Sequence, residues 1–241
     1  MEKKLLEIQQ QTAFERVEFI FIEPASPGLE REVLEPFCEQ HENCRCITLD
    51  ERVSLYRAWN LGWEAATAPL VCISNMDDAM HPELLEQILV DSQKYQWDVA
   101  SVLIAKQAMD ADMDVWSHSR LVRLELSTRP GPFFVWKRTL QGTFGMFDTD
   151  FDYVGDKDFW ARVMHAKLKT RLISKVLYLY TKHPAQLSKI SAFKAKRRSE
   201  STRGEMKAAP YVWPAFYTRK VQLIRLLRKV PFFGRRFIVD A

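Results

Sequence analysis

The sequence contains no apolar run long enough to cross a membrane. Its longest stretch without a charged residue is the 12-residue segment 65–76, whereas a membrane-spanning helix needs about 20 apolar residues. Residues 1–6 also lack the apolar core of a signal peptide. Only 4 of the 241 residues are cysteine, too few for a disulfide framework in a chain of this length. This predicts reduced thiols and a cytoplasmic protein.

Glycine is scarce as well, and its 8 residues form no Gly-x-Gly-x-x-Gly motif, no Walker loop and no Gly-x-Ser-x-Gly elbow. The Cys44-x-Cys46 pair has no second pair, and the 5 histidines lack the spacing of zinc ligands. These absences exclude the usual dinucleotide-binding, P-loop, serine hydrolase and zinc-site classes. We interpret His81 and His183 as structural or surface residues.

The composition is that of a globular protein, with 47% hydrophobic and 27% charged residues. The net charge of +4 is unevenly distributed, because residues 193–241 contain 13 Lys or Arg and only 3 acidic residues. We therefore predict a mildly acidic domain over residues 1–190 and a basic C-terminal extension over 191–241.

Strand and helix patterns alternate through the first hundred residues. Such alternation, with short uncharged strands, predicts an α/β fold with a mainly parallel sheet flanked by helices. The second half is less regular, and residues 106–130 are mixed loop and helix. The expected strands are 17–22, 46–49, 70–74, 99–105, 132–136 and 172–180; the expected helices are 2–13, 29–41, 54–67, 82–95 and 158–166.

Acidic residues stand directly after two of the expected strands. Glu23 follows the first strand, and Asp77-Asp78 follows the strand at 70–74. Ligands of open parallel sheets bind beyond the carboxyl ends of the strands, so these acids are candidate site residues. Adjacent carboxylates suit Mg²⁺ or Mn²⁺, which takes one or two of them together with phosphate and water. Taken alone, however, the pair is more typical of the N-terminus of the helix at 82–95.

A second acidic segment, Gly155-Asp156-Lys157-Asp158, precedes the helix expected at 158–166. An acid in this place is again typical of helix capping. The functional interpretation makes Asp156 a general base that takes a proton from a hydroxyl group. The motif alone does not decide between the two.

The order of these motifs resembles the family-2 glycosyltransferases of the GT-A fold. That family shows an Asn-x-Gly helix, an Ala-rich stretch, an apolar strand and an acidic motif before a helix that begins with proline. The resemblance spans roughly residues 5–189. Its matching segments are Asn60 and Gly62, the strand 70–74, Asp77-Asp78, Pro82, residues 131–138 and 144–148, Gly155 to Arg162, and residues 180–188.

The resemblance implies a role for each matched position. Asp78 would coordinate the Mg²⁺ or Mn²⁺ ion that holds the diphosphate of a nucleotide-sugar, and Asp77 would lie beside it, on the metal or the ribose. Asp156 would deprotonate the acceptor hydroxyl in a single displacement that inverts the anomeric carbon. Glu23 and Asn60 would belong to the nucleotide-binding site.

Some features depart from the family, which opens with a central strand that helps to hold the nucleobase. This chain opens inside what resembles the helix after that strand. Without the strand, backbone groups inside the sheet would lack hydrogen-bond partners, which costs about 1–3 kcal/mol for each group. Upstream residues, closure of the gap by neighbouring strands, or a degenerate relative would each explain it. Glu23-Pro24 and Asn75 replace acidic residues of the family. For Trp116 and His118, a structural role is favoured over lining the acceptor site.

The basic extension contains a predicted amphipathic helix at 219–230. Leu223, Leu226, Leu227 and Val230 lie on one face of this helix and most of its charges on the other. Such a helix is typical of proteins that bind a membrane surface, here through residues 219–237. The alternative, a helix packed on the domain with its charges in water, is about as well supported. No nucleic-acid-binding module is recognisable.

These expectations describe a metal-dependent, inverting glycosyltransferase in the cytoplasm or at the inner membrane face. Its donor would be a nucleotide-sugar, most simply a UDP-sugar, and its acceptor a hydroxyl of a polysaccharide or lipid-linked glycan. The alternative is a degenerate GT-A-like protein that acts by interaction alone. A nucleotidyltransferase of similar fold would need a Gly-rich, Arg-containing start that this sequence lacks.

Overall fold

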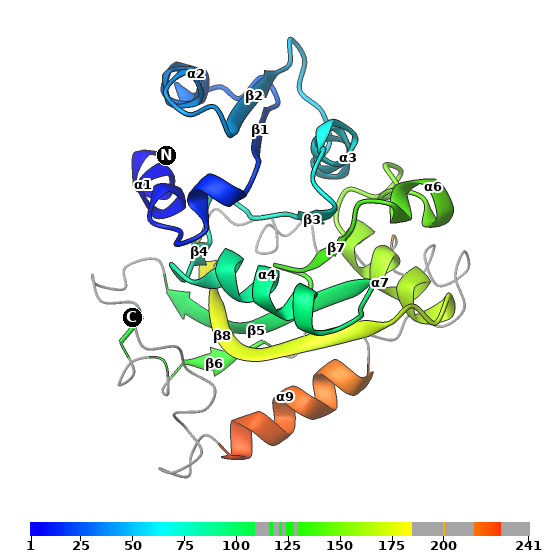
Figure 1. Ribbon diagram of the computed structural model, residues 1–241. Helices are drawn as coiled ribbons and strands as arrows, with labels where there is room; N and C mark the ends of the chain where they lie inside the picture. The colour runs from blue at the N-terminus through cyan, green and yellow to red at the C-terminus, as the bar shows by residue number, and fades with distance from the viewer. Residues whose placement is uncertain are drawn as a thin grey trace.

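The computed structural model describes residues 1–108, 116–117, 121, 124–127, 130–184, 200 and 215–227. Strands and flanking helices form the expected α/β fold (Figure 1). The helices are α1 (Glu2–Gln9), α2 (Glu30–Glu39), α3 (Leu55–Ala65), α4 (Leu84–Lys94), α6 (Leu140–Phe144), α7 (Gly155–His165) and α9 (Ala215–Leu227), with a 3₁₀ turn, η1, at Phe14–Arg16. The strands are β1 (Phe19–Glu23), β2 (Cys44–Thr48), β3 (Leu70–Cys72), β4 (Ala79–Met80), β5 (Val99–Ala108), β6 (Glu125–Leu126), β7 (Val135–Lys137) and β8 (Thr170–Lys182).

The strands form two sheets in the described part of the chain. One contains only β1 and β2, which are parallel. The other has the order β3-β7-β5-β8-β4, with β6 paired to β5. The two longest ladders, β1–β2 and β5–β8, are parallel, and the four short ladders are antiparallel. The sheet is therefore built around the long parallel pair β5–β8.

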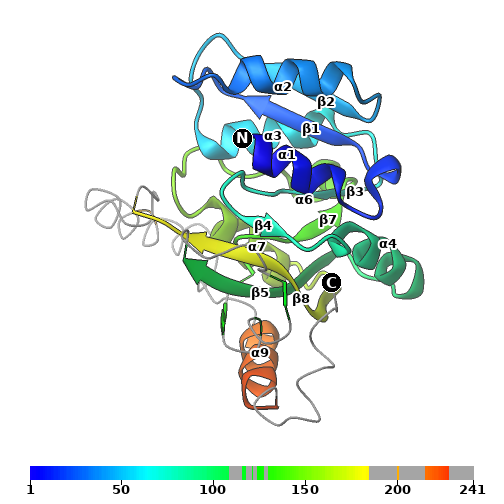
Figure 2. The ribbon, with the colours of Figure 1, turned by 90° about the vertical axis from the view of Figure 1, so that its left-hand side faces the viewer.

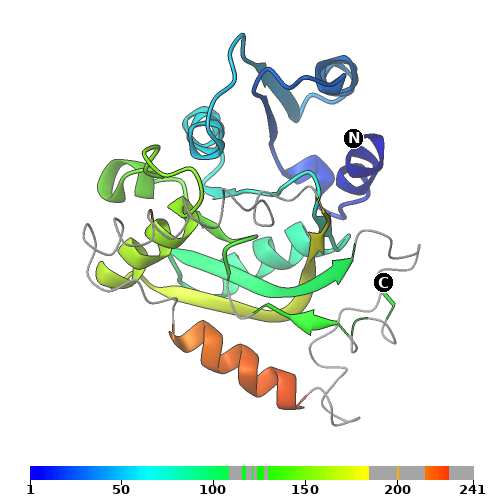
Figure 3. The ribbon, with the colours of Figure 1, turned by 180° about the vertical axis from the view of Figure 1, so that it is seen from behind.

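Strand β5 is buried on both faces because its residues alternate between two core clusters. Ala100, Val102 and Ile104 pack in the cluster that contains α4. Leu103 and Ala105 pack in the cluster that contains α9. The views from the side and from behind show α9 beneath β5 and β8, on the face away from α4 (Figures 2 and 3). A strand buried on both faces needs the continuous apolar sequence that β5 has.

A third cluster is rich in aromatic residues and joins α3 to α7. Trp63, Trp136 and Phe159 are each almost fully buried in it. Phe147 stacks on Phe159 at 4.9 Å between ring centroids. Because α3 and α7 share this cluster, the elements that carry Asn60 and Asp156 are fixed relative to one another.

The two sheets do not join. In the described part of the chain, β1 pairs only with β2 and β3 pairs only with β7. Closure of the gap by neighbouring strands, one of the explanations left open by the sequence, is therefore wrong. The strand expected at 70–74 is uncharged, yet residues 70–74 are only half-buried.

Helix α9 packs on the domain, and it does so through a face other than the leucine face. Tyr217, Val221 and Ile224 are buried against the sheet. Leu223 and Leu226 are exposed, with 54% and 67% of their surface accessible. Residues 228–237 of the expected membrane-binding segment lie outside the described residues. Within the described ranges, no helix is both long and apolar enough to cross a membrane.

Several helices and strands begin or end at residues other than those predicted from the sequence, because tertiary contacts determine these boundaries. Helix α7 begins at Gly155, three residues before the expected start, so that Asp156 lies in its first turn. Helix α1 ends at Gln9 and is followed by the η1 turn. The short elements α6, β4 and β6 have two to five residues, too few to leave a periodic signal.

Candidate functional site

A cavity of about 1860 Å³ lies between the two sheets. Three of the acidic residues singled out in the sequence line it: Glu23 at the end of β1, Asp77 in the loop after β3, and Asp156 in the first turn of α7. Asn60 and Asp78 are not among the lining residues. The fold thus brings together three candidate residues that are up to 133 positions apart.

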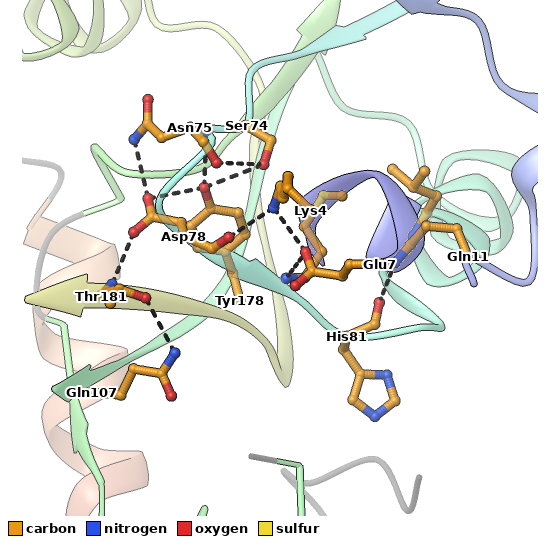
Figure 4. Close-up of polar contacts among 12 residues, drawn as sticks. Lys4, Glu7, Gln11, Ser74, Asn75, Asp78, His81, Gln107, Tyr178 and Thr181 are labelled. Carbon is orange, nitrogen blue, oxygen red and sulfur yellow. Dashed lines mark hydrogen bonds and ion pairs between the residues drawn. The ribbon is translucent and has the colours of Figure 1, made fainter. Parts of the chain in front are cut away.

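The Asp78 carboxylate points away from the cavity into the protein. One oxygen, Oδ1, accepts from the backbone N–H of Thr181 at 2.9 Å. The other, Oδ2, accepts from the Tyr178 hydroxyl at 3.0 Å and from the Asn75 side-chain amide at 3.1 Å. Figure 4 shows Asp78 held between its own loop and strand β8. Both oxygens are therefore already engaged by the protein.

Burial raises the pKa of Asp78 to about 6, although the hydrogen bond from Thr181 acts in the opposite direction. Burial, followed by the nearby Asp78 charge, also raises the pKa of Tyr178 well above its usual value. Tyr178 therefore keeps its proton and donates a hydrogen bond to the Asp78 carboxylate. The hydrogen bond between Tyr178 and Asp78 therefore attaches the loop that follows β3 to strand β8.

Helix α1 holds the same loop from the other side (Figure 4). The Lys4 ammonium, which is almost fully buried, donates to the Asp78 backbone carbonyl and to Glu7, each at 2.7 Å. Glu7 in turn accepts from the backbone N–H of Met80 at 2.7 Å. Gln11 donates to the carbonyl of His81 at 2.9 Å. The backbone from Asp78 to His81 is thus fixed by side chains of α1 and by Gln11, which follows the helix.

Asp77, in contrast, lines the cavity, and its side chain is about half exposed. Its Oδ2 lies 2.9 Å from Nε2 of His183, which also lines the cavity. The sequence favoured a structural or surface role for His183, because the scattered histidines lack the spacing of zinc ligands. Only the length and position of β8, which ends at Lys182, bring it opposite Asp77.

The residues present fit a divalent cation that is coordinated partly by protein side chains and partly by a bound phosphate. The described residues contain no cluster of three or more His, Cys, Asp or Glu side chains that could hold a metal. Asp77 and His183 instead offer one carboxylate and one imidazole on the cavity wall. Mg²⁺ and Mn²⁺ sites that bind phosphates often use only one or two protein ligands. A bound phosphate and water would have to complete the coordination.

Asp156 is positioned by Tyr56 and by its own helix. The Tyr56 hydroxyl lies 3.4 Å from Asp156 Oδ1, which also accepts from the Lys157 N–H at 2.8 Å. Burial and the Asp156 charge raise the pKa of Tyr56 well above its usual value, so Tyr56 remains the donor. The helix N-terminus favours a negative charge here. Asp156 therefore presents a carboxylate to the cavity.

Gly155 allows Tyr56 to approach this closely. A Cβ atom at position 155 would lie 2.8 Å from two carbons of the Tyr56 ring, closer than van der Waals contact permits. The ring cannot easily move, because it is 98% buried beside Trp59 and Phe147. Gly155 and Tyr56 thus form one packing unit at the start of α7.

Asn60 serves as a structural link in this arrangement. Its side-chain amide donates to the Phe147 carbonyl at 2.8 Å, and its Oδ1 accepts from the Phe147 N–H at 3.0 Å. Both ends of the amide are therefore used to hold α3 to the segment before α7. Its expected contact with a nucleotide stays a prediction.

Glu23 lies at the cavity but is itself well buried. Its Oε1 accepts from the Ser26 N–H at 2.6 Å, and its Oε2 lies 3.7 Å from the Arg31 guanidinium. Trp116 packs edge-on against His81 at 4.9 Å and does not line the cavity. His118 lies outside the described residues.

A sequence-family model described as "Glycosyl transferase family 2" matches residues 3–154, more than half of the chain. The chain belongs to this family. The segment that matches carries Glu23 and Asp77, and Asp156 follows it directly. No curated protein matches the chain.

Solved structures support the same fold. S. aureus TarS 1–349 in complex with UDP has a TM-score of 0.59 and 15% identity, over 95% of this chain and 67% of that one. Its complex with UDP-GlcNAc has a TM-score of 0.60 and 14% identity, over 95% and 68%. The mannosyltransferase PcManGT from Pyrobaculum calidifontis, in complex with GDP-Man and Mn²⁺, has a TM-score of 0.62 and 18% identity, over 90% and 64%. At such identities the likeness shows the GT-A fold alone, and this chain spans about two thirds of each of these structures.

The raised pKa of Asp78 predicts a pH dependence of folding stability. The folded protein binds the Asp78 proton more tightly than the unfolded chain, whose ordinary pKa is 3.8. Stabilisation from this group is complete below pH 4 and is lost as the pH rises through about 6. Over this pH range, the free energy of unfolding measured in urea should fall by up to about 3 kcal/mol more in the wild type than in Asp78→Asn. Asp50→Asn, at an exposed position, is the control and should follow the wild type. A difference in unfolding free energy between wild type and Asp78→Asn that does not change with pH would contradict the prediction.

Gly155→Ala should destabilise the protein by roughly 1–3 kcal/mol, because the added methyl group collides with the Tyr56 ring. Gly142→Ala in α6 is the matched control, since a Cβ there meets nothing within 4 Å. Because alanine favours a helix over glycine, the control should be neutral or more stable by up to about 1 kcal/mol. Thermal unfolding of both variants measures the difference, and equal effects would refute the close packing.

Proposed function

We propose that this chain transfers a sugar from a nucleotide-sugar, most simply a UDP-sugar, to a hydroxyl group with inversion of the anomeric carbon. The observation that carries the proposal is that Asp77 and Asp156 line one cavity of a family-2 chain. One acid is suited to the donor side and the other to the acceptor side. TarS with UDP and UDP-GlcNAc, and PcManGT with GDP-Man and Mn²⁺, support a nucleotide-sugar as the donor.

On the donor side we assign the metal-binding role first to Asp77, with His183 beside it. Asp77 is half exposed on the cavity wall, whereas both Asp78 oxygens are engaged inside the protein. Asp78 then acts by holding the loop that presents Asp77. A bound Mg²⁺ or Mn²⁺ would supply positive charge against the diphosphate leaving group. Glu23, which lines the same cavity, would contact the nucleoside.

On the acceptor side Asp156 takes the proton of the attacking hydroxyl. Its carboxylate faces the cavity from the first turn of α7, and Tyr56 fixes its orientation. The acceptor hydroxyl would meet this carboxylate from the cavity side. The hydroxyl oxygen, once relieved of its proton, attacks the anomeric carbon from the side opposite the leaving nucleotide, which produces inversion.

The acceptor is proposed to be a polysaccharide or a lipid-linked glycan at a membrane surface. Helix α9 supports this, because it packs through Tyr217, Val221 and Ile224 and leaves Leu223 and Leu226 exposed. Arg219 and Lys220 on the same helix are also exposed. Exposed leucines beside basic side chains suit insertion among anionic headgroups.

Isothermal titration and a turnover assay test the two acidic residues separately. Asp77→Asn should weaken UDP binding in the presence of Mn²⁺ by about tenfold or more, because it removes a carboxylate ligand. Asp156→Asn should leave UDP binding unchanged and lower the release of UDP from UDP-glucose or UDP-GlcNAc, or of GDP from GDP-mannose, by roughly 10²–10⁴-fold.

Asp50→Asn is the matched control, since Asp50 is exposed and does not line the cavity. It should change neither binding nor turnover. A folded wild-type protein that binds neither UDP nor GDP with Mn²⁺ would favour the alternative, a degenerate GT-A-like interaction protein. This alternative is supported by the edges of β1 and β3, each of which pairs with only one other strand in the described part of the chain.

Sedimentation with lipid vesicles tests the membrane surface. The wild type should co-sediment with vesicles of anionic phospholipid and much less with phosphatidylcholine alone. The double variant Leu223→Ser, Leu226→Ser should lose roughly tenfold or more in binding, because two apolar side chains no longer insert. Val90→Ser is the control, as Val90 is an exposed apolar residue of α4. Equal binding by all three proteins would refute this role of α9.

A further inference from the structure

Three basic side chains converge on one carboxylate near the carboxyl ends of β5 and β8. Glu125 of β6 lies 2.7 Å from the Lys106 ammonium and 3.3 Å from the Arg225 guanidinium. Its other carboxylate oxygen lies 3.9 Å from the Lys182 ammonium. We call these four residues the basic cluster. In the described part of the chain, Glu125 is the only acidic side chain in ion-pair contact with the three bases, so two positive charges of the cluster are not neutralised.

Strand pairing places three members of the basic cluster on one face of the sheet. Lys106 lies directly opposite Glu125 in the antiparallel ladder of β5 and β6. Lys182 lies opposite Ala108 in the parallel ladder of β5 and β8, two positions beyond Lys106. Directly paired residues share a face, as do residues two apart in a strand. The cavity reaches this face, because Lys106 and its β8 partner Tyr180 both line it.

Arg225 reaches the basic cluster from the opposite face of the sheet. It belongs to α9, which packs on that face through Val221 and Ile224. Figures 1 and 3 show β6 between β5 and the carboxyl-terminal end of α9. From there the Arg225 guanidinium donates to the carbonyl of Leu126 and to Glu125. The basic cluster therefore connects α9 with the cavity across the short strand β6.

The electrostatics of the basic cluster favour a further anion. A hydrogen bond from Lys106 lowers the pKa of Glu125, and the charges of all three bases act in the same direction, although partial burial opposes them. Like charges on neighbouring strands repel one another, and one carboxylate offsets only part of this repulsion. The three basic side chains are each between 25% and 45% exposed. Their donors are thus accessible to a phosphate group, which accepts charge-assisted hydrogen bonds from both guanidinium and ammonium groups.

The surroundings of the basic cluster indicate what carries this phosphate. Leu226 directly follows Arg225 in α9, and both Leu226 and Leu223 are largely exposed. On its other side the basic cluster borders the cavity that Asp156 lines. A free phosphate would use the charges and leave the leucines in water. A phosphate attached to a hydrocarbon chain would use both, because apolar and basic side chains together bind anionic amphiphiles at a membrane surface.

We propose that the basic cluster binds the phosphate group of a membrane amphiphile, whose hydrocarbon chain lies beside Leu223 and Leu226 and whose head group extends into the cavity. The proposal rests on the proposed function, because it makes this amphiphile the acceptor whose hydroxyl group Asp156 deprotonates. It adds to that function a phosphate in the acceptor and the residues that recognise it.

Isothermal titration with octyl phosphate, below its micelle-forming concentration and without nucleotide or metal, tests the site. The wild type should bind octyl phosphate about tenfold or more tightly than inorganic phosphate or octyl glucoside, because neither offers both a charge and a chain. Lys182→Gln and Arg225→Gln should each weaken binding by roughly fivefold or more, since each removes a charged donor. Unchanged melting temperatures show that the variants are folded.

Glu125→Gln separates a binding site from a purely structural cluster. Removing the competing negative charge should strengthen the binding of octyl phosphate by about threefold or more. If Glu125 served only to order the three bases, its loss would disorder them and weaken binding. Weaker binding by a folded Glu125→Gln variant would therefore overturn the proposal.

Lys220→Gln is the matched control, because it removes one positive charge from an exposed position of α9 outside the basic cluster. It should bind octyl phosphate as the wild type does. Equal losses in Lys220→Gln and Lys182→Gln would indicate diffuse charge attraction and would overturn the site. Inorganic phosphate that binds as tightly as octyl phosphate would overturn the amphiphile.

The outcome can be distinguished from failure of the proposed sugar transfer, because that is tested separately with UDP and Mn²⁺. A wild-type protein that binds UDP with Mn²⁺ and does not bind octyl phosphate refutes the phosphate site alone. One that binds octyl phosphate through the basic cluster and binds neither UDP nor GDP supports the phosphate site and counts against the sugar transfer.

Discussion

The buried carboxylate of Asp78 is the interaction on which the arrangement of the cavity depends. It accepts three hydrogen bonds, from Asn75 in its own loop and from Tyr178 and Thr181 in β8. These bonds fix the loop after β3 against a strand that lies about 100 residues further along the chain. While Asp78 is held inside the protein, the neighbouring Asp77 lies at the cavity wall. Of the two adjacent acids, Asp78 therefore has a structural role, and Asp77 is the one that reaches the cavity.

The sequence was informative where local patterns decide the structure. The alternation of apolar strands with helices predicted the α/β class, and the acids after β1 and β3 were expected at one end of the sheet because strand ends meet there. The division of roles between Asp77 and Asp78 could not be predicted, since it depends on Tyr178. His183 was missed because only the length and position of β8 bring it opposite Asp77. The buried face of α9 was also unpredictable, because Val221 and Leu223 are equally apolar and only the sheet surface selects between them.

Side chains of α1 and α3 hold the two sides of the cavity in place. Asn60 ties α3 to the backbone of Phe147, and Tyr56 on the same helix contacts Asp156. Lys4 and Glu7 of α1 hold the loop that carries Asp77. Side chains on rigid helices therefore set the geometry of groups that lie at loops and helix ends, which is the arrangement that precise positioning requires.

The aromatic cluster between α3 and α7 gives the protein an optical property. Trp59 and Trp63 line the cavity, and Trp63 contacts Trp136 at 5.1 Å between ring centroids. Indole emission responds to changes in local polarity and to stacking with a nucleobase. Because two of the protein's 7 tryptophans line the cavity, a ligand bound there should change the intrinsic fluorescence, and no attached dye is needed.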